Sequence, residues 1–449
     1  MGEVVFLKNV GTSDVKVRSR VTKYAREMGE RIWQAFDKLK EEIELPLMEP
    51  TFDELRQCGI DKIDCMVLFV TNQEDGNPQD TIYYGKIINR LLKGEGWAKT
   101  KWGIEIGDVI LKEIRDNPAD YGKMMEWFKQ HLQRCSGEMA GDVRVIVELT
   151  GGTPATCMAL LFYSVYFMGE LVEAVYVYRR DDVGRALCMP IGKELHKALL
   201  VKMCLALLEN YNFAGVRDMC EKMGDEAGEK FAEYLWRRSM LDVKGGRDAI
   251  EGWMRVGYRS EREFEIIEEL ENIGTTSGRV RELYWNMWVQ MQRGELTEWL
   301  ERFMSIREVF YQWYFENEYN LKADGDWRDV WREFVESRGL IERAHAAEEE
   351  IRVEEPTSRS YEFVLKELGR EEILSYWKKY DKDDGVFGLR NKWVHEGKGV
   401  SERAIREGCG MNVREIMDDL RGFIEKCGIG LGDNPWEKDT KILKEHIAR

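Results

Sequence analysis

The sequence lacks several features that would mark a special class of protein. Its nine cysteines form no CxxC pair and do not combine with the five histidines at zinc-site spacing, so neither a zinc site nor a disulfide framework is indicated. The longest apolar run, residues 157–168, is too short to cross a bilayer, and the amino-terminal segment lacks the basic residues of a signal peptide. We therefore expect a globular cytoplasmic protein with reduced thiols.

Positive charge is also in deficit, since the formal net charge is −16. Non-specific coating of nucleic acid needs clustered positive charge, so this function is not expected. Stable DNA binding is not expected either, because no helix-turn-helix pattern is recognisable. We expect any RNA or nucleotide site to be a local basic pocket in an acidic protein.

Short apolar segments alternate with amphipathic segments up to about residue 192. Apolar strands that alternate with helices are typical of a parallel sheet covered on both faces, so we predict a Rossmann-like domain. The predicted strands are 3–8, 64–70, 104–111, 143–149, 173–179 and 185–191, and the predicted helices are 20–44, 80–94, 118–135 and 154–169.

Beyond residue 192 the strand signals stop, and helical periodicity continues to the carboxyl end. We predict about ten helices there, with breaks at Gly245–Gly246, 274–278 and 324–326. The predicted fold class is therefore α/β plus all-α. The predicted domains are 1–192 (Rossmann-like), 193–290 (helical connector) and 291–449 (carboxyl-terminal helical bundle).

Two unusual turns follow predicted strands, NVGTSD at 9–14 and TGGTP at 150–154. Ligands of parallel α/β sheets bind outside the carboxyl ends of the strands, where both turns lie. Thr153 is a natural N-cap, Pro154 suits the first helical position, and free N–H groups at such a helix start attract phosphate. The turns match neither a Walker A motif nor GxGxxG.

The first turn adds similar donors and a carboxylate, Asp14, that could meet a ribose hydroxyl or an adenine amine. The polar loop 71–81 either closes over a ligand or is only a solvated loop, and both turns could also be simple strand-to-helix connections. The candidate nucleotide-binding residues are Asn9, Gly11, Thr12, Ser13, Asp14, Thr71, Asn72, Thr150, Gly151, Gly152, Thr153 and Pro154.

A second motif, RNKWVH, lies at 390–395. On a helix, Asn391 and His395 are i,i+4 neighbours on one face, and the long side chain of Arg390 can reach the same point. A histidine can move the protons of RNA cleavage, an arginine can stabilise charge on the phosphate, and an asparagine can orient either partner. The rival pair of Arg338 and His345 and the other histidines (His131, His196 and His446) are interpreted as surface or packing residues.

Together these motifs resemble those of the CARF–HEPN ancillary ribonucleases of type III CRISPR systems. GTSD and TGGTP look like the ligand loops of CARF domains, and RNKWVH is similar to the R-N-x3-H signature of HEPN nucleases. Residues 300–319 look like the helix that usually precedes that signature, whereas 193–290 match no motif and look like the variable connector of the family.

The resemblance implies a cyclic oligoadenylate activator, with cyclic tetra-adenylate expected, bound at the two-fold axis of a homodimer. It implies cleavage of single-stranded RNA in antiviral defence by Arg390, Asn391 and His395, without metal or cofactor, leaving a 2′,3′-cyclic phosphate. Some CARF domains also cut their activator, and Asn9, Thr12 and Ser13 are the positions where that could happen here.

Symmetry gives a separate reason to expect a dimer, because one chain offers one good Arg/His set and a two-fold axis supplies two. Activation then requires ligand binding energy that differs between two packings of the dimer, with the helices from Lys193 onward as the lever. Two alternatives stay open. One is a nucleotide-sensing module without catalysis, and the other is a dinucleotide-dependent enzyme, which the missing GxGxxG disfavours.

Overall fold

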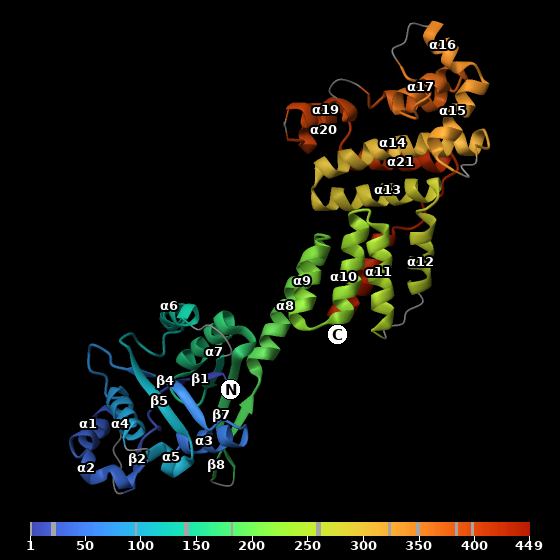
Figure 1. Ribbon diagram of the computed structural model, residues 1–449. Helices are drawn as coiled ribbons and strands as arrows, with labels where there is room; N and C mark the ends of the chain where they lie inside the picture. Colours follow the sequence, from blue (N-terminus) through green and yellow to red (C-terminus); the bar gives the residue numbers. More distant parts are fainter. Residues whose placement is uncertain are drawn as a thin grey trace. The chain divides into compact units, whose positions relative to one another are not determined.

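The computed structural model describes residues 2–18, 24–94, 97–138, 143–180, 183–256, 262–321, 325–346, 351–381, 385–396 and 399–449. The chain divides into two compact units, Met1–Leu199 and Leu200–Arg449 (Figure 1). None of the described helices combines the length and apolar character that crossing a membrane requires.

The first unit is built on a six-stranded sheet with the order β5-β4-β1-β6-β7-β8. All six predicted strands are confirmed, and the first five in this order run parallel. The last, β8, is antiparallel to β7, because the two strands follow each other too closely for a crossover connection. The strands are β1 (Glu3–Asn9), β4 (Lys62–Thr71), β5 (Glu105–Ile114), β6 (Val143–Glu148), β7 (Val172–Arg180) and β8 (Val183–Met189).

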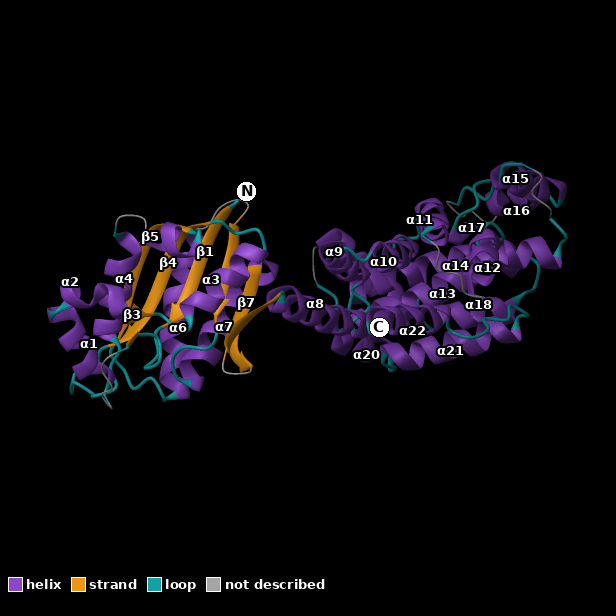
Figure 2. Ribbon diagram, turned by 90° about the horizontal axis from the view of Figure 1, so that it is seen from below, coloured by secondary structure: helices purple, strands orange, loops and turns teal. Residues whose placement is uncertain are grey.

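Helices cover both faces of this sheet, as Figure 2 shows. Val4 and Phe6 of β1 point into one core, and the alternate residues Val5 and Leu7 point into the other. The first core includes α1 (Ala25–Gln34), α3 (Met48–Gln57), α4 (Ile82–Lys93) and α5 (Trp97–Trp102), and the second includes α6 (Tyr121–Glu138) and α7 (Pro154–Met168).

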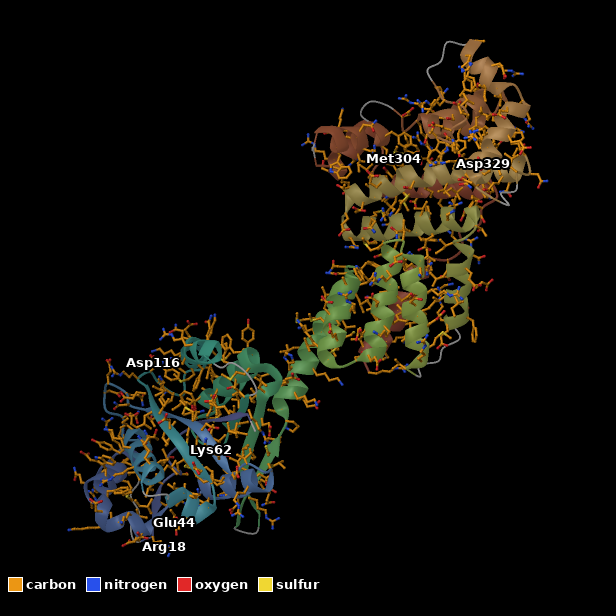
Figure 3. The ribbon with its side chains drawn as sticks, in the orientation of Figure 1. Arg18, Glu44, Lys62, Asp116, Met304 and Asp329 are labelled. Atoms are coloured by element: carbon orange, nitrogen blue, oxygen red, sulfur yellow. The ribbon has the colours of Figure 1, made fainter. Side chains whose placement is uncertain are left out.

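The helix predicted over 20–44 is shorter than expected. It consists of α1, the short α2 (Phe36–Leu39) and a 3-10 turn (Lys40–Glu42), and it ends at β3 (Ile43–Glu44). β3 pairs with β2 (Lys16–Val17), and Arg18 and Glu44 form an ion pair of 2.7 Å beside this pair (Figure 3). Backbone pairing with a distant segment thus replaces the last two residues of the predicted helix.

The described part of the second unit contains only helices, as predicted, but fifteen of them instead of about ten. One continuous core, with members from Cys204 to Ile447, holds them together, and the boundary predicted near residue 290 falls within α13. The helices are α8 (Ile191–Glu209), which begins in the first unit, α9 (Phe213–Met223), α10 (Glu226–Ser239), α11 (Val243–Arg255), α12 (Arg262–Asn272), α13 (Thr276–Arg293), α14 (Leu296–Glu318), α15 (Trp327–Ser337), α16 (Leu340–Ala346), α17 (Ser358–Glu367), α18 (Glu371–Lys378), α19 (Val386–Glu396), α20 (Glu402–Cys409), α21 (Val413–Lys426) and α22 (Pro435–Ile447).

Side-chain caps explain the larger number of helices. Asn212, Asp225 and Asp242 each accept a backbone N–H at a helix start that the apolar periodicity did not mark. The break predicted at Gly245–Gly246 is wrong, since both glycines lie in the first turns of α11. The break at 274–278 is confirmed, because Thr275 caps α13.

Candidate ligand pocket and candidate catalytic helix

A cavity of about 300 Å³ lies at the carboxyl ends of β1, β4 and β5, beside the start of α7. This is the edge of the sheet where the two turns, 9–14 and 150–154, were expected to meet. Six of the predicted residues line the cavity: Asn9, Gly11, Thr12, Thr71, Gly152 and Thr153.

Four other candidates lie beside the cavity and not on its wall. Ser13 is exposed, and the amide group of Asn72 donates a hydrogen bond of 3.1 Å to Glu113. The hydroxyl oxygen of Thr150 accepts a 2.7 Å hydrogen bond from the backbone N–H of Val177. Pro154 occupies the first turn of α7 behind the N-cap Thr153, as the sequence predicted.

The polar loop after β4 forms one wall of the cavity. Asp80, fully buried, organises this loop, because its carboxylate accepts the backbone N–H of Gln73 at 3.0 Å and pairs with the Arg26 guanidinium at 2.7 Å. The sequence indicated the loop but not the individual side chains that reach the cavity. These side chains are Gln73, Asn77, Gln79 and Thr81. Two other segments complete the wall with Asn117, Pro118 and Thr156.

A buried charge cluster lies beneath the cavity. Lys8 Nζ is 2.9 Å from Asp14 Oδ1 and also contacts the carboxylate of Glu148, and all three side chains are 0% exposed. Asp14 therefore pairs with Lys8. The sequence had suggested instead that its carboxylate would face a bound nucleotide. Burial raises the pKa of Asp14 and opposes the effect of Lys8, whereas the two carboxylates outweigh burial and raise the pKa of Lys8.

This cluster also binds the backbone of both turns. Asp14 accepts the N–H of Gly11 at 2.6 Å, and Glu148 accepts the N–H groups of Thr150 at 2.8 Å and Gly151 at 3.4 Å. The N–H of Thr153 donates to the hydroxyl of Thr156 at 3.0 Å. Four of the N–H groups that the sequence offers to a phosphate are thus already occupied by the protein.

The two glycine-containing turns touch through their backbones. A Cβ on Gly11 would lie 2.7 Å from the amide nitrogen of Gly152, and a Cβ on Gly151 would lie 2.2 Å from the carbonyl oxygen of Asn9. Neither neighbour is a flexible side chain that could move aside. Glycine at these positions is therefore a packing requirement.

The described residues that line the cavity carry no formal charge, so the expectation of a basic pocket is wrong here. The lining is made of amides, hydroxyls and a few apolar groups. Asn9 is 2% exposed, and its side-chain oxygen accepts no hydrogen bond from any described residue. A buried acceptor without a partner can accept a hydrogen bond from a water or a ligand, and a neutral polar lining suits a base or a sugar better than a phosphate.

The second motif lies on α19, so the helix predicted for Asn391 and His395 is confirmed. The Arg390 side chain is 31% exposed and Asn391 is exposed, so both can be reached from solvent. The side chain of His395 lies outside the described residues. Phe387, one turn before Arg390 on α19, packs on α14 against Phe303, with ring centroids 5.7 Å apart.

The other histidines have the surroundings of packing or surface residues. His131 stacks on Trp127, with 3.7 Å between the ring centroids, and His446 lies 2.9 Å from Asp225. His345, of the rival pair, is exposed, while its partner Arg338 stacks over Phe334 with 4.2 Å to the centroid. These contacts agree with the interpretation made from the sequence.

The fold of the chain is similar to that of a solved structure, in agreement with the fold that the resemblance of the motifs implied. A solved structure with this fold is Enterococcus italicus Csm6 bound to cyclic hexa-2′-fluoro-hexa-dAMP. It aligns with 99% of this chain and 100% of its own, with a TM-score of 0.60 and 14% sequence identity. No protein-family model and no curated protein matches the sequence.

Proposed function

We propose that the chain is an endoribonuclease of antiviral defence that a cyclic oligoadenylate activates. One observation carries this proposal: a chain with the fold of Csm6 over its whole length presents Arg390 and Asn391 to solvent on a helix that also contains His395. The sequence identity of 14% is too low to transfer an activity by itself, so the chemistry of the two sites must support the function.

The proposed activator binds at the cavity above the buried cluster. The cavity volume of about 300 Å³ suits one nucleoside. The solved structure of similar fold holds a cyclic adenylate analogue. The exocyclic amine of adenine could donate a hydrogen bond to the unpartnered side-chain oxygen of Asn9. Cyclic tetra-adenylate remains the expected ring. If the pocket also degrades its activator, Thr12 and Asn9 are better placed than Ser13, because they line the cavity.

The proposed chemistry uses side chains alone. His395 would move a proton to or from the 2′-hydroxyl and the leaving 5′-oxygen, and Arg390 would stabilise the charge on the phosphate. Asn391 would orient one of these partners. Attack by the 2′-oxygen on the adjacent phosphorus releases the 5′-oxygen and leaves a 2′,3′-cyclic phosphate, and this step needs neither metal nor cofactor.

An exposed apolar surface on the first unit supports the proposed homodimer. Met158, Phe162 and Tyr166 are 48–64% exposed and, spaced by four residues, form a stripe along α7. On β7 and β8, Tyr176 is cross-strand to Leu187. We define the surface by the exposed large apolar side chains of residues 158–199, which are Met158, Phe162, Tyr166, Leu171, Tyr176, Tyr178, Leu187, Leu195 and Leu199.

The size of this surface fits a second copy of the chain. Nine large side chains, each about half exposed, offer on the order of 900 Å² at about 100 Å² each. A stable dimer buries about 800 Å² per partner. The nine side chains themselves carry no charge, and the exposed Arg185 lies beside them, cross-strand to Tyr178. Because α7 begins at Thr153 on the cavity wall, this interface would also place two ligand cavities near one axis.

Cleavage of single-stranded RNA in EDTA tests the proposed function, with and without cyclic tetra- or hexa-adenylate. We expect cutting only when the activator is present. Arg390→Ala should abolish cutting and leave activator binding by calorimetry unchanged. Intact RNA in every reaction, with normal activator binding, would favour a nucleotide-sensing module without catalysis.

A further inference from the structure

Arg390 is held by a residue outside the sequence motif. Its Nε donates a hydrogen bond of 3.3 Å to Oε1 of Glu301, which lies on α14 and is 89 positions earlier in the chain. The two side chains are 31% and 30% exposed, so the pair lies at the surface where a substrate can reach it.

Packing between α14 and α19 fixes the direction from which Arg390 approaches Glu301. Phe387 is 3% exposed, and the Arg307 guanidinium stacks over its ring with 3.8 Å to the centroid. This contact sets the rotation of α19 about its axis one turn before Arg390. The side chain of Arg390 therefore leaves the helix on the side of α14, where Glu301 meets its Nε.

The atom that Glu301 engages determines what the guanidinium can still do. Arginine has five N–H donors, one on Nε and four on the two terminal nitrogens. A contact through Nε orients the plane of the group and leaves the terminal nitrogens to bind two phosphate oxygens at once. Lysine could not be held and used in this way, because its ammonium has no second, fixed set of donors.

We propose that Glu301 is the positioning residue of Arg390: it binds Nε and so turns the two terminal nitrogens toward the phosphate of the RNA. This inference rests on the proposed function and adds a residue that the Arg-Asn-x3-His motif does not contain. Glu301 touches no reacting atom, so its effect on cleavage passes through Arg390.

The exposure of the pair makes this role separable from folding. An ion pair about one third exposed contributes little to stability, because solvent and salt screen it. Removing Glu301 should therefore leave the chain folded. A misplaced guanidinium, in contrast, lowers the rate of the chemical step strongly.

The experiment measures kcat and KM for single-stranded RNA with the full-length chain at saturating cyclic tetra-adenylate. The variants are Glu301→Ala, Glu301→Gln and, as the matched control, Glu298→Ala, which removes a 3.5 Å ion pair with Arg302 on the same helix. We expect Glu301→Ala to lower kcat by roughly tenfold to a hundredfold, with a smaller change in KM. Glu301→Gln should recover most of kcat, because its amide oxygen still accepts the Nε–H, and Glu298→Ala should match the unaltered chain.

Two results would overturn the inference while leaving the proposed function in place, provided that Arg390→Ala is inactive. One is an unchanged kcat in Glu301→Ala. The other is a higher rate without activator in Glu301→Ala, because Glu301 would then restrain Arg390. If Arg390→Ala itself cuts RNA at the normal rate, the proposed function fails and the inference fails with it.

Discussion

Replacing Lys8 by methionine tests the structural basis of the ligand pocket. The substitution keeps most of the side-chain volume but removes the only cation within 4 Å of the buried carboxylates of Asp14 and Glu148 among the described residues. Breaking a fully buried ion pair by removing one partner costs about 3–5 kcal/mol. We expect Lys8→Met to lose about this much of its free energy of unfolding at pH 7.

The loss should depend on pH. Burial already raises the pKa of Asp14 in the folded chain, and without Lys8 it should rise further. A carboxyl group whose folded pKa lies above its unfolded pKa binds a proton more tightly in the folded state. Its stabilising contribution is therefore present at low pH and is lost as pH rises through the folded pKa. Lys8→Met should recover part of its stability on acidification from pH 7 to pH 5.

Urea unfolding at both pH values measures these changes, and Lys62→Met is the control. Lys62 lies on the neighbouring strand β4 and also pairs with a carboxylate, Asp64, but its side chain is 54% exposed, so little change is expected. Unfolding of Lys8→Met at the same urea concentration as the unaltered chain would show that Lys8 does not neutralise the buried carboxylates. A large loss of equal size at pH 5 and pH 7 would also contradict this role, because the cost would then come from packing and not from unpaired charge.

Two further predictions concern the pocket and the dimer surface. Gly151→Ala places a Cβ 2.2 Å from the carbonyl oxygen of Asn9, so it should weaken binding of cyclic tetra-adenylate by tenfold or more (roughly 1.4 kcal/mol) in calorimetry. Its control, Gly122→Ala, adds a Cβ no closer than 3.5 Å to its neighbours and should bind normally, so equal affinities would contradict the proposed packing. The double substitution Phe162→Glu, Tyr166→Glu places charges on the apolar surface and should give monomers in sedimentation equilibrium, whereas a dimer of unchanged affinity would exclude this surface as the interface.

Most of the fold could be predicted because short apolar strands and amphipathic helices differ in period. All six strands of the sheet were found in this way. The direction of β8 was not, since periodicity carries no information on direction. The β2–β3 pair was missed because tertiary pairing there overrides local helix preference.

The candidate site was predictable in position but not in chemistry. Glycines and small polar residues after strands indicated the edge of the sheet at which the cavity lies. Lys8 and Glu148, however, are 140 positions apart, and no local pattern says that their charges neutralise each other in the interior. The role of Asp14 and the uncharged lining of the cavity both follow from that distant pairing. Glu301 was missed for the same reason, because it lies on a helix far from the motif that it contacts.

The central claim is that His395 and Arg390 cut RNA by proton transfer and charge stabilisation. Its most direct test is end-group analysis, by mass spectrometry, of RNA cut in EDTA at saturating cyclic tetra-adenylate, with the unaltered chain and with His395→Ala. We expect 2′,3′-cyclic phosphate and 5′-hydroxyl ends from the unaltered chain and no cleavage by His395→Ala. Fragments with 5′-phosphate ends, or undiminished cutting by His395→Ala, would contradict it.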